Sequence, residues 1–331
     1  MLVDIPANSL SDPEAFVRLV AEPCRPTVIR GLVADWPVTR AGLAGPEALA
    51  MYLKRLASDA SLEMFVGDPS IDGRYFYSDD LVRFNFERRP TTLSGALSAI
   101  VSRHPDEPSI YAGSAPVDTH LPGFGGENRL ACLDPAIQAR IWLGNPSLVS
   151  CHYDAMDNLA CVVAGERRFT LYPPEAIGSL YVGPIDHTMA GQPVSLAVGA
   201  ADPSAYPRFD AIADQAVHVD LKPGDALYLP KLWWHQVKST QPVNGLVNYW
   251  WDAFAAGPDA PYTALLLTMI AVSERPPAER RAWQAFFNHY AFRTDRHPLE
   301  HMPPEQHGIL GPLRPRNYGA IRAHVMRMLR G

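Results

Sequence analysis

The stretch Pro223-Gly224-Asp225-Ala226-Leu227-Tyr228-Leu229-Pro230-Lys231-Leu232-Trp233-Trp234-His235 joins a turn, a short apolar run and a histidine. A second stretch, His152-Tyr153-Asp154, ends 81 positions before His235. Two imidazoles and one carboxylate are the ligand set of the 2-His-1-carboxylate triad, which binds Fe(II) and leaves other coordination positions open. Because residues i and i+2 of a strand point to the same face, His152 and Asp154 can reach one ion. The sequence therefore predicts a catalytic metal site formed by His152, Asp154 and His235.

The pattern His-x-Asp occurs three times among the 11 histidines, so two other pairs compete with His152 and Asp154. One is His104-Pro105-Asp106, whose flanking prolines and charges are typical of a solvated loop. The other is His218-Val219-Asp220, which lies in a strand-like run. Only a turn and one short strand separate that pair from His235. The pair and His235 would therefore lie on adjacent strands of a hairpin, and all three side chains would have to reach the same depth in the fold. We therefore prefer His152 and Asp154 and keep His218 and Asp220 as the rival pair.

The composition is that of a globular protein with one large or two modest domains, because 47% of the 331 residues are hydrophobic and 19% are charged. The net charge of −6 argues against nucleic acid or an anionic membrane surface as a partner. The apolar runs are shorter than the ~18 to 20 residues that a membrane span requires. The first residues lack the pattern of a secretory signal, so we expect a cytoplasmic protein.

The four cysteines show no CxxC spacing, and a chain of this length does not depend on disulfides. They are Cys24, Cys132, Cys151 and Cys161. We expect reduced thiols. Cys151 adjoins His152 but points to the opposite face of its strand, so it is a poor metal ligand.

Local composition and residue patterning divide the chain into three regions. Residues 1–108 combine a short strand with helical patterns and are expected to buttress a core downstream. Residues 109–252 contain short runs of β-branched and aromatic residues between Gly, Pro and Asp turns, which is typical of a sandwich or barrel and marks the catalytic core. Residues 253–331 are helical in pattern. The expected helices cover residues 12–19, 45–52, 92–101, 262–273, 278–290 and 319–330, and the first strand covers residues 26–32.

Two hairpins are predicted within the central region. Residues 158–163 and 167–172 flank Ala164-Gly165-Glu166, and residues 216–221 and 226–229 flank the Pro-Gly-Asp turn. The Pro-rich segment between the hairpins, about residues 173–215, is expected to be an irregular insert.

Four motifs in order carry a resemblance to a known family. They are Ile141-Trp142-Leu143-Gly144-Asn145, His152-Tyr153-Asp154-Ala155-Met156-Asp157-Asn158, Gly165-Glu166-Arg167-Arg168-Phe169-Thr170-Leu171-Tyr172-Pro173-Pro174 and the stretch 223–235. With them the chain resembles the cupin-like JmjC oxygenases, and in particular their asparaginyl hydroxylases of hypoxia-inducible factor. The resemblance implies a mainly β fold with α additions, a double-stranded β-helix. It also implies Fe(II) held by the three ligands, O₂, and 2-oxoglutarate converted to succinate and CO₂.

The resemblance also calls for a cation that binds the far carboxylate of 2-oxoglutarate, and Arg167 is our choice. Arg167 alternates in phase with Phe169 and Leu171, whereas Arg168 shares its face with polar groups, so Arg167 is predicted to point inward. The asparaginyl hydroxylase has a lysine at this place. A surface arginine beside a turn is the alternative.

Three further residues match family positions beside the co-substrate. Tyr111 matches a tyrosine that reaches the same carboxylate, although a lone strand tyrosine is often a packing residue. Asn158 is in phase with the ligand pair, and Asn248 interrupts an apolar strand. Either amide could instead be a core amide with satisfied hydrogen bonds. Val149 replaces the threonine that the family has three places before the first ligand, so one carboxylate contact is missing.

Aromatic residues in strands are more often core than ligand contacts, so only one or two of four tryptophans are expected at the cavity. These are Trp233, Trp234, Trp250 and Trp251.

The sequence as a whole predicts an Fe(II)- and 2-oxoglutarate-dependent oxygenase that hydroxylates an amino-acid side chain in a protein or peptide. A small-molecule substrate and lysine demethylation remain alternatives. So do a non-oxidative metal-dependent cupin, such as an isomerase or lyase, and a binding protein that has kept the fold. The apolar C-terminal helices predict a homodimer.

Overall fold

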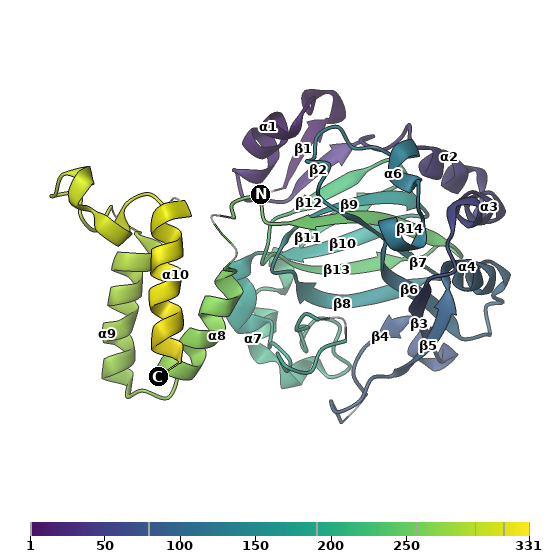
Figure 1. Ribbon diagram of the computed structural model, residues 1–331. Coiled ribbons are helices and arrows are strands. Elements are labelled where there is room, and N and C mark those ends of the chain that lie inside the picture. Colours follow the sequence, from purple (N-terminus) through teal and green to yellow (C-terminus); the bar gives the residue numbers. More distant parts are fainter. Residues whose placement is uncertain are drawn as a thin grey trace. The chain divides into compact units, whose positions relative to one another are not determined.

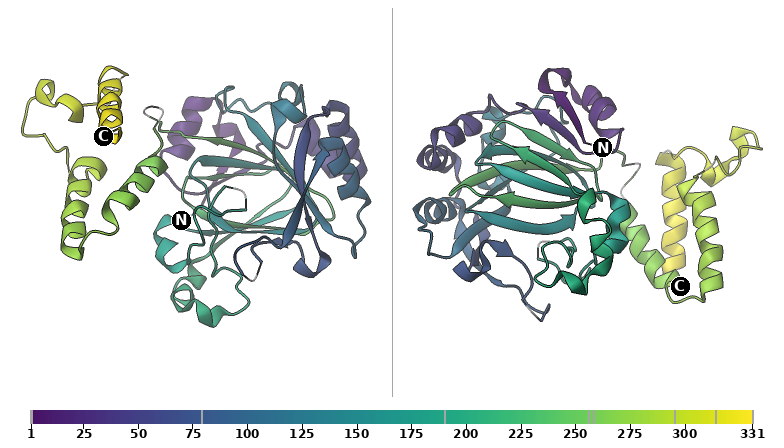
Figure 2. Two further views of the ribbon diagram at one scale, coloured as in Figure 1. Left: turned by 60° about the horizontal axis from the view of Figure 1, so that its bottom comes forward. Right: turned by 180° about the vertical axis from the view of Figure 1, so that it is seen from behind.

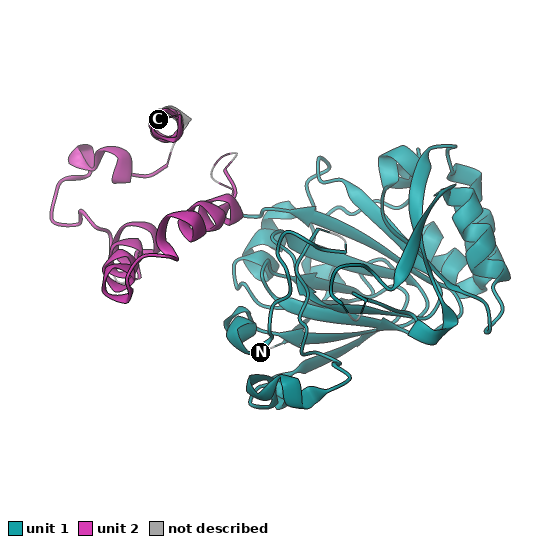
Figure 3. Cartoon of the chain, turned by 90° about the horizontal axis from the view of Figure 1, so that it is seen from below, with its two compact units in different colours: residues 1–253 teal, residues 254–331 magenta. Residues whose placement is uncertain are grey.

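A computed structural model describes residues 2–330 except residues 79, 190, 256, 258, 295 and 314. The chain divides into two compact units, residues 1–253 and 254–331 (Figure 3). The strands of residues 1–108 are part of the two sheets of the first unit, four in the larger sheet and one in the smaller, as far as the structure describes them. Among the described residues, no helix combines the length and apolar character needed to cross a membrane.

The first unit is built on two β-sheets (Figure 1). Within the described residues, the larger sheet has nine strands in the spatial order β1 (Val3–Pro6), β2 (Thr27–Arg30), β12 (Ala226–Leu229), β9 (Asp157–Ala164), β14 (Asn244–Trp251), β7 (Ala139–Gly144), β6 (Ser109–Pro116), β3 (Ser61–Gly67) and β5 (Phe86–Thr92). The smaller sheet of the same described residues has five, in the order β11 (Val217–Leu221), β10 (Arg167–Tyr172), β13 (Trp234–Ser239), β8 (Ser147–Tyr153) and β4 (Arg74–Tyr75). The prediction of a mainly β jelly-roll with α additions is confirmed.

Helices accompany the sheets of the first unit, and three longer helices lie in the described part of the second (Figure 2). In the first unit they are α1 (Pro13–Phe16), α2 (Pro37–Ala44), α3 (Pro46–Leu56), α4 (Leu93–Ser102), α5 (Val117–His120), α6 (Phe124–Glu127) and α7 (Pro207–Asp210). In the second unit they are α8 (Pro261–Val272), α9 (Pro277–Phe287) and α10 (Pro315–Leu329). Short 3₁₀ or π turns are η1 (Ala7–Ser9), η2 (Val17–Ala21), η3 (Pro69–Ile71), η4 (Pro174–Ser179), η5 (Pro203–Ala205), η6 (Ala213–Gln215), η7 (Asn288–Phe292), η8 (Pro304–Gln306) and η9 (Gly308–Leu310).

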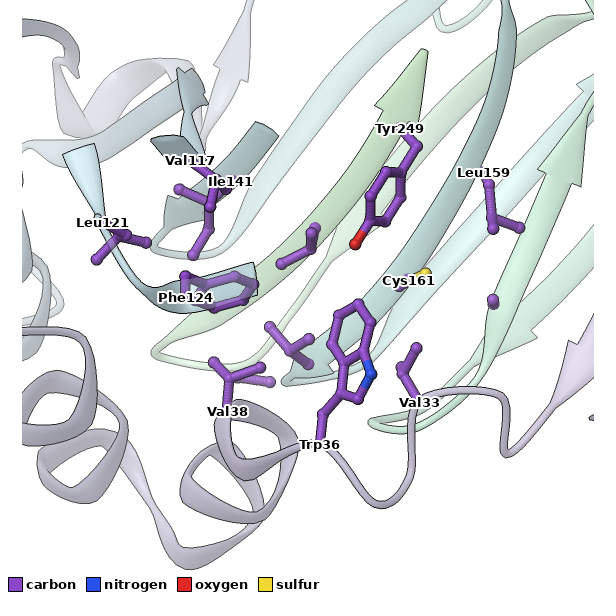
Figure 4. Packing of buried hydrophobic residues seen from close by; sticks show 14 of the residues in the cluster. Val33, Trp36, Val38, Val117, Leu121, Phe124, Ile141, Leu159, Cys161 and Tyr249 are labelled. Atoms are coloured by element: carbon purple, nitrogen blue, oxygen red, sulfur yellow. The ribbon is translucent and has the colours of Figure 1, made fainter. Parts of the chain in front are cut away.

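Strand β9 separates two hydrophobic cores, because all eight of its residues are buried. Leu159 and Cys161 belong to the core that includes Trp36 and Phe124 from the helical layer (Figure 4). Ala160, by contrast, belongs to the core that contains side chains of both sheets. The period of two along a strand explains this division. The second core fills one part of the space between the sheets and supports the strands that carry the site.

Both predicted hairpins are wrong. β9 pairs with β12 and β14, whereas β10 pairs with β11 and β13, so the turn at Gly165 carries the chain from the larger sheet to the smaller one. The turn at Gly224 does the same between β11 and β12. Both glycines have positive φ, which a hairpin turn and a crossing turn can equally require. The strand limits were therefore readable from the sequence, but the partners were not.

The segment 173–215 is irregular, as predicted, and consists mainly of short turns. One isolated bridge lies within the segment, between Val182 and Ser195, and another joins its Val194 to His152 of β8. This insert therefore lies beside the end of β8.

Candidate metal centre

The structure brings the three predicted ligands together at the ends of two neighbouring strands. His152 is the next-to-last residue of β8, Asp154 follows that strand directly, and His235 is the second residue of β13. His152 and His235 are register partners across the antiparallel pair. One ligand atom from each of the three residues lies within 4.8 Å of the others, and His235 Nε2 is 3.8 Å from Asp154 Oδ2. This group could hold a divalent metal ion.

Both imidazoles are oriented by a backbone carbonyl two residues earlier in the chain. Nδ1 of His152 lies 2.8 Å from the Ser150 oxygen, and Nδ1 of His235 lies 3.0 Å from the Trp233 oxygen. A carbonyl can only accept, so Nδ1 carries the proton in both rings and Nε2 presents its lone pair. This arrangement is the usual support of a metal-bound histidine.

The electrostatics of His235 also suit a metal ligand. Burial, and next the neighbouring His152, lower the pKa of His235 to about 4, although Asp154 acts in the opposite direction. The ring is therefore neutral near pH 7, and a neutral imidazole can donate its lone pair to a metal without first losing a proton.

A chain of hydrogen bonds holds the carboxylate of Asp154. Its Oδ2 accepts from Asn158 Nδ2 at 3.2 Å and from Trp250 Nε1 at 3.1 Å. Asn248 Nδ2 donates to Asn158 Oδ1 at 3.1 Å, and Trp142 Nε1 donates to Asn248 Oδ1 at 2.7 Å. Both amides thus have partners in the core, which was one of the two alternatives, yet both also line the inner pocket. Their clearest role is to orient the carboxylate of Asp154, which is one of the three candidate metal ligands.

Arg167 points inward, as the alternation in β10 predicted, and only 3% of it is exposed. Its Nε and Nη2 have no hydrogen-bond partner among the described residues. Burial lowers the pKa of Arg167, and a hydrogen bond with Tyr111 opposes that shift. Arg168 points outward and binds Asp220 with two bonds of 2.7 and 2.9 Å. A buried guanidinium with open donors is suited to an anionic ligand.

The inner pocket connects Arg167 to the metal ligands. It has a volume of about 60 Å³, and its lining includes Tyr111, Arg167 and Phe169 together with all three ligands. Val149 also lines it but offers no donor. A larger outer cavity of about 400 Å³ adjoins it and shares His152 and Asp154. A small anion-binding pocket and a larger cavity therefore meet at the candidate metal position.

The rival residues lie elsewhere. His218 and Asp220 are exposed on β11, where His218 contacts Thr170 and Asp220 binds Arg168. His104 is exposed in a loop. Among the described residues, the three predicted ligands are the only group of His, Cys, Asp or Glu with metal-binding geometry.

Of the four tryptophans considered, Trp250 lines both cavities. Trp234 packs on Tyr153, and Trp251 packs on Phe16.

Two residues of the site had not been assigned a role from the sequence. Trp142 was quoted only as part of a motif, and His120, which lines the outer cavity, carried no local signal.

A jelly-roll with two histidines and a carboxylate at its strand ends defines a cupin-type protein with a candidate metal centre. The comparison with protein families agrees: the chain belongs to the cupin-like domain family, whose model matches residues 13–257.

The chain is similar to several curated proteins. It is 38% identical over 104 residues to lysine-specific demethylase JMJ31 of Arabidopsis thaliana, which covers 31% of this chain and 19% of that protein. It is 26% identical to Jumonji C domain-containing protein 5 of Drosophila melanogaster, over 75% of this chain and 60% of that protein. HSPB1-associated protein 1 of Mus musculus is 23% identical, over 82% of this chain and 58% of that protein. The chain thus spans less than two thirds of each of these relatives. The family match and the names of the first two relatives indicate a cupin-like domain of the JmjC type.

Proposed function

We propose that this protein is an Fe(II)- and 2-oxoglutarate-dependent oxygenase that hydroxylates an amino-acid side chain in a protein or peptide. The observation that carries the proposal is the guanidinium of Arg167, which is buried with open donors in the pocket that also contains the three metal ligands. An unpaired buried cation is costly, and a carboxylate compensates it with two parallel hydrogen bonds. A 2-oxo dicarboxylate can occupy both ends of the pocket, with one end at the three metal ligands and the far carboxylate at Arg167.

The residues of the inner pocket have separate proposed roles. His152, Asp154 and His235 would hold Fe(II), which would activate O₂ for the oxidative decarboxylation of 2-oxoglutarate to succinate and CO₂, with one oxygen atom entering succinate and the other the substrate. Arg167 binds the far carboxylate, and Tyr111 lines the same pocket beside the guanidinium. Because Val149 cannot donate, Arg167 and Tyr111 are the polar groups that this end of the pocket offers to the carboxylate.

The outer cavity is the proposed substrate site. Its volume of about 400 Å³ and its aromatic walls, which include Phe65, Tyr75 and Trp142, suit an amino-acid side chain. Arg140 stacks over the Trp250 ring at 5.9 Å, and no carboxylate among the described residues pairs with it. Arg140 lies next to two lining residues, Trp250 and Ser114, and its positive charge there disfavours a methylated ammonium group, so hydroxylation fits better than demethylation.

Succinate formation tests the proposal. The Fe(II)-loaded protein should convert 2-oxoglutarate to succinate under air but should not act on 2-oxopentanoate, which has the same chain length without the far carboxylate. His152→Ala should remove the activity. A substrate peptide should gain one oxygen atom, without release of formaldehyde. Iron binding without succinate would favour a non-oxidative cupin instead.

We also propose a reducing compartment, namely the cytoplasm. All four cysteines are free thiols, and Cys132, Cys151 and Cys161 are buried. Burial raises the pKa of Cys132 to about 11 and that of Cys151 further, which keeps both as unreactive thiols.

A further inference from the structure

A four-residue turn, Pro230 to Trp233, lies between strand β12 and strand β13, which carries His235. The turn is closed by a hydrogen bond of 3.2 Å from the Trp233 N–H to the Pro230 carbonyl. Its third residue, Leu232, has a φ of 69° and is 45% exposed. Glycine usually occupies that position when φ is positive, because a side chain makes such a φ costly. The turn is therefore strained, and its surroundings must hold it in this conformation.

The same turn contacts two of the three candidate metal ligands. The Leu232 N–H donates to the backbone carbonyl of Asp154 at 2.8 Å. The carbonyl of Trp233 lies 3.0 Å from Nδ1 of His235 and accepts its hydrogen. The conformation of the turn thus sets the position of the Asp154 backbone and the direction of the His235 ring. Because the φ of Leu232 fixes how its N–H lies relative to the Trp233 carbonyl, a turn relaxed to a negative φ could not keep both contacts.

A buried carboxylate anchors the turn at its second residue, Lys231. Oδ2 of Asp157, a residue that is 1% exposed, lies 3.3 Å from Nζ of Lys231. Other groups fix this carboxylate: Oδ1 accepts from the Tyr228 hydroxyl at 2.9 Å, and Oδ2 accepts from the Ala253 N–H at 3.0 Å. Nζ of Lys231 also pairs with Asp252. Since a buried charge without its partner is costly, the ion pair with Asp157 resists movement of the turn.

We propose that Lys231 is a positioning residue of the metal centre. Its ion pair with Asp157 keeps the turn in the strained conformation, and that conformation holds two of the ligands in place. Without the pair the turn relaxes, and only the fraction of molecules that still has the strained turn is ready to bind metal. The apparent metal affinity falls by that fraction. The inference rests on the proposed metal site and does not depend on the reaction performed there.

The strain in the turn sets the size of the expected effect. A left-handed backbone at a residue with a side chain is disfavoured by roughly tenfold, so Lys231→Met should weaken metal binding by about that factor. Leu232→Gly removes the penalty, because glycine adopts a positive φ freely. The double variant Lys231→Met with Leu232→Gly should therefore bind metal within about threefold of the original protein. A lysine that served stability alone would not be rescued by a glycine beside it.

Titration of Co(II) into the full-length protein under argon measures these affinities, since Co(II) lies next to Fe(II) in its affinity for such sites. Its visible absorption also reports the arrangement of the coordinating atoms, independently of activity. Arg30→Met is the matched control, because it removes an ion pair of 2.7 Å with the buried Asp225. Asp225 directly precedes β12, whereas Lys231 follows that strand. The control should keep the affinity and the spectrum of the original protein, even if its thermal midpoint falls.

The inference is overturned if Lys231→Met binds Co(II) as tightly as Arg30→Met does, or if adding Leu232→Gly recovers no affinity. Lys231→Met leaves Asp157 without its cation and could fail to fold for that reason. Lys231→Met with Asp157→Asn removes that charge as well, and it should show the same loss and the same recovery with Leu232→Gly.

Succinate formation is measured separately, so that the two proposals can fail independently. Its absence, together with the expected loss and recovery of Co(II) affinity, refutes the oxygenase proposal alone. Its presence, together with an unchanged Co(II) affinity in Lys231→Met, refutes the role of Lys231 alone. Absence of Co(II) binding by the original protein would overturn both.

Discussion

Arg167 is the residue whose replacement should affect co-substrate binding most. Removing one partner of a buried charge pair costs roughly 3 to 5 kcal/mol, equivalent to about two to four orders of magnitude in affinity. We therefore expect Arg167→Ala to weaken 2-oxoglutarate binding by that factor without loss of iron. The affinity of Arg167→Lys for 2-oxoglutarate should lie between those of the original protein and Arg167→Ala, because lysine keeps the charge but loses the planar fork of donors. Calorimetric titration of 2-oxoglutarate into the Fe(II)-loaded variants under argon measures the effect.

Arg168 is the matched control, since it is adjacent in sequence but is exposed and paired with Asp220. Arg168→Ala should leave the affinity for 2-oxoglutarate within a few-fold of the original value. If Arg168→Ala has the large effect and Arg167→Ala does not, Arg167 is not the residue that binds the carboxylate.

Single residues differ in how far the sequence could place them. The inward direction of Arg167 was predictable because alternation along a strand is a local property. The roles of Asn158 and Asn248 were left open, since these amides lie 90 positions apart in the chain and each finds its partner only in the folded sheet. His120 had no local signal at all, because its significance depends on burial and on a cavity formed by distant segments.

The turns that carry the chain between the two sheets are the elements most sensitive to change. Gly165 has a φ of +68°, and a Cβ there would collide with Asn244 Oδ1. Gly31 has a similar φ of +71° but open space around it. Gly31→Ala should therefore cost about 1 kcal/mol of unfolding free energy from backbone strain alone. Gly165→Ala should cost at least ~1 kcal/mol more from overpacking.

Urea denaturation of the two alanine variants gives both free energies. Equal losses would show that Asn244 moves aside without cost and that the crossing at Gly165 is less tightly packed than the structure indicates.

The same turns explain why the fold could be predicted only in part. The limits of the four strands in the predicted hairpins, the two turn glycines and the irregular insert follow from local composition, and they agree with the structure, the strand limits to within one residue. Pairing does not follow, because β10 finds its partners in β11 and β13 across long loops. A glycine turn between two alternating strands describes a hairpin and a crossing between sheets equally well.

At the scale of the whole molecule, we predict that the chain forms a homodimer through its C-terminal unit. Large hydrophobic side chains of that unit are exposed, among them Ile270 at 84%, Phe292 at 69% and Met328 at 69%. An apolar surface of this kind is typically covered by a partner. Light scattering at micromolar concentration should give twice the chain mass of 36.4 kDa.

Ile270→Glu should shift the protein toward the single-chain mass. Met51→Glu, at a site in α3 that is 73% exposed, is the control and should leave the mass unchanged. A single-chain mass for the original protein would contradict the dimer prediction.

The central claim is that His152, Asp154 and His235 form one Fe(II) site, and the iron content of three histidine variants tests it most directly. After anaerobic loading and removal of free metal, the account predicts one Fe(II) per chain in the original protein and in His218→Ala. It predicts none in His152→Ala or His235→Ala, because two remaining ligands do not retain the ion. Loss of iron from His218→Ala with retention by His152→Ala would contradict the account.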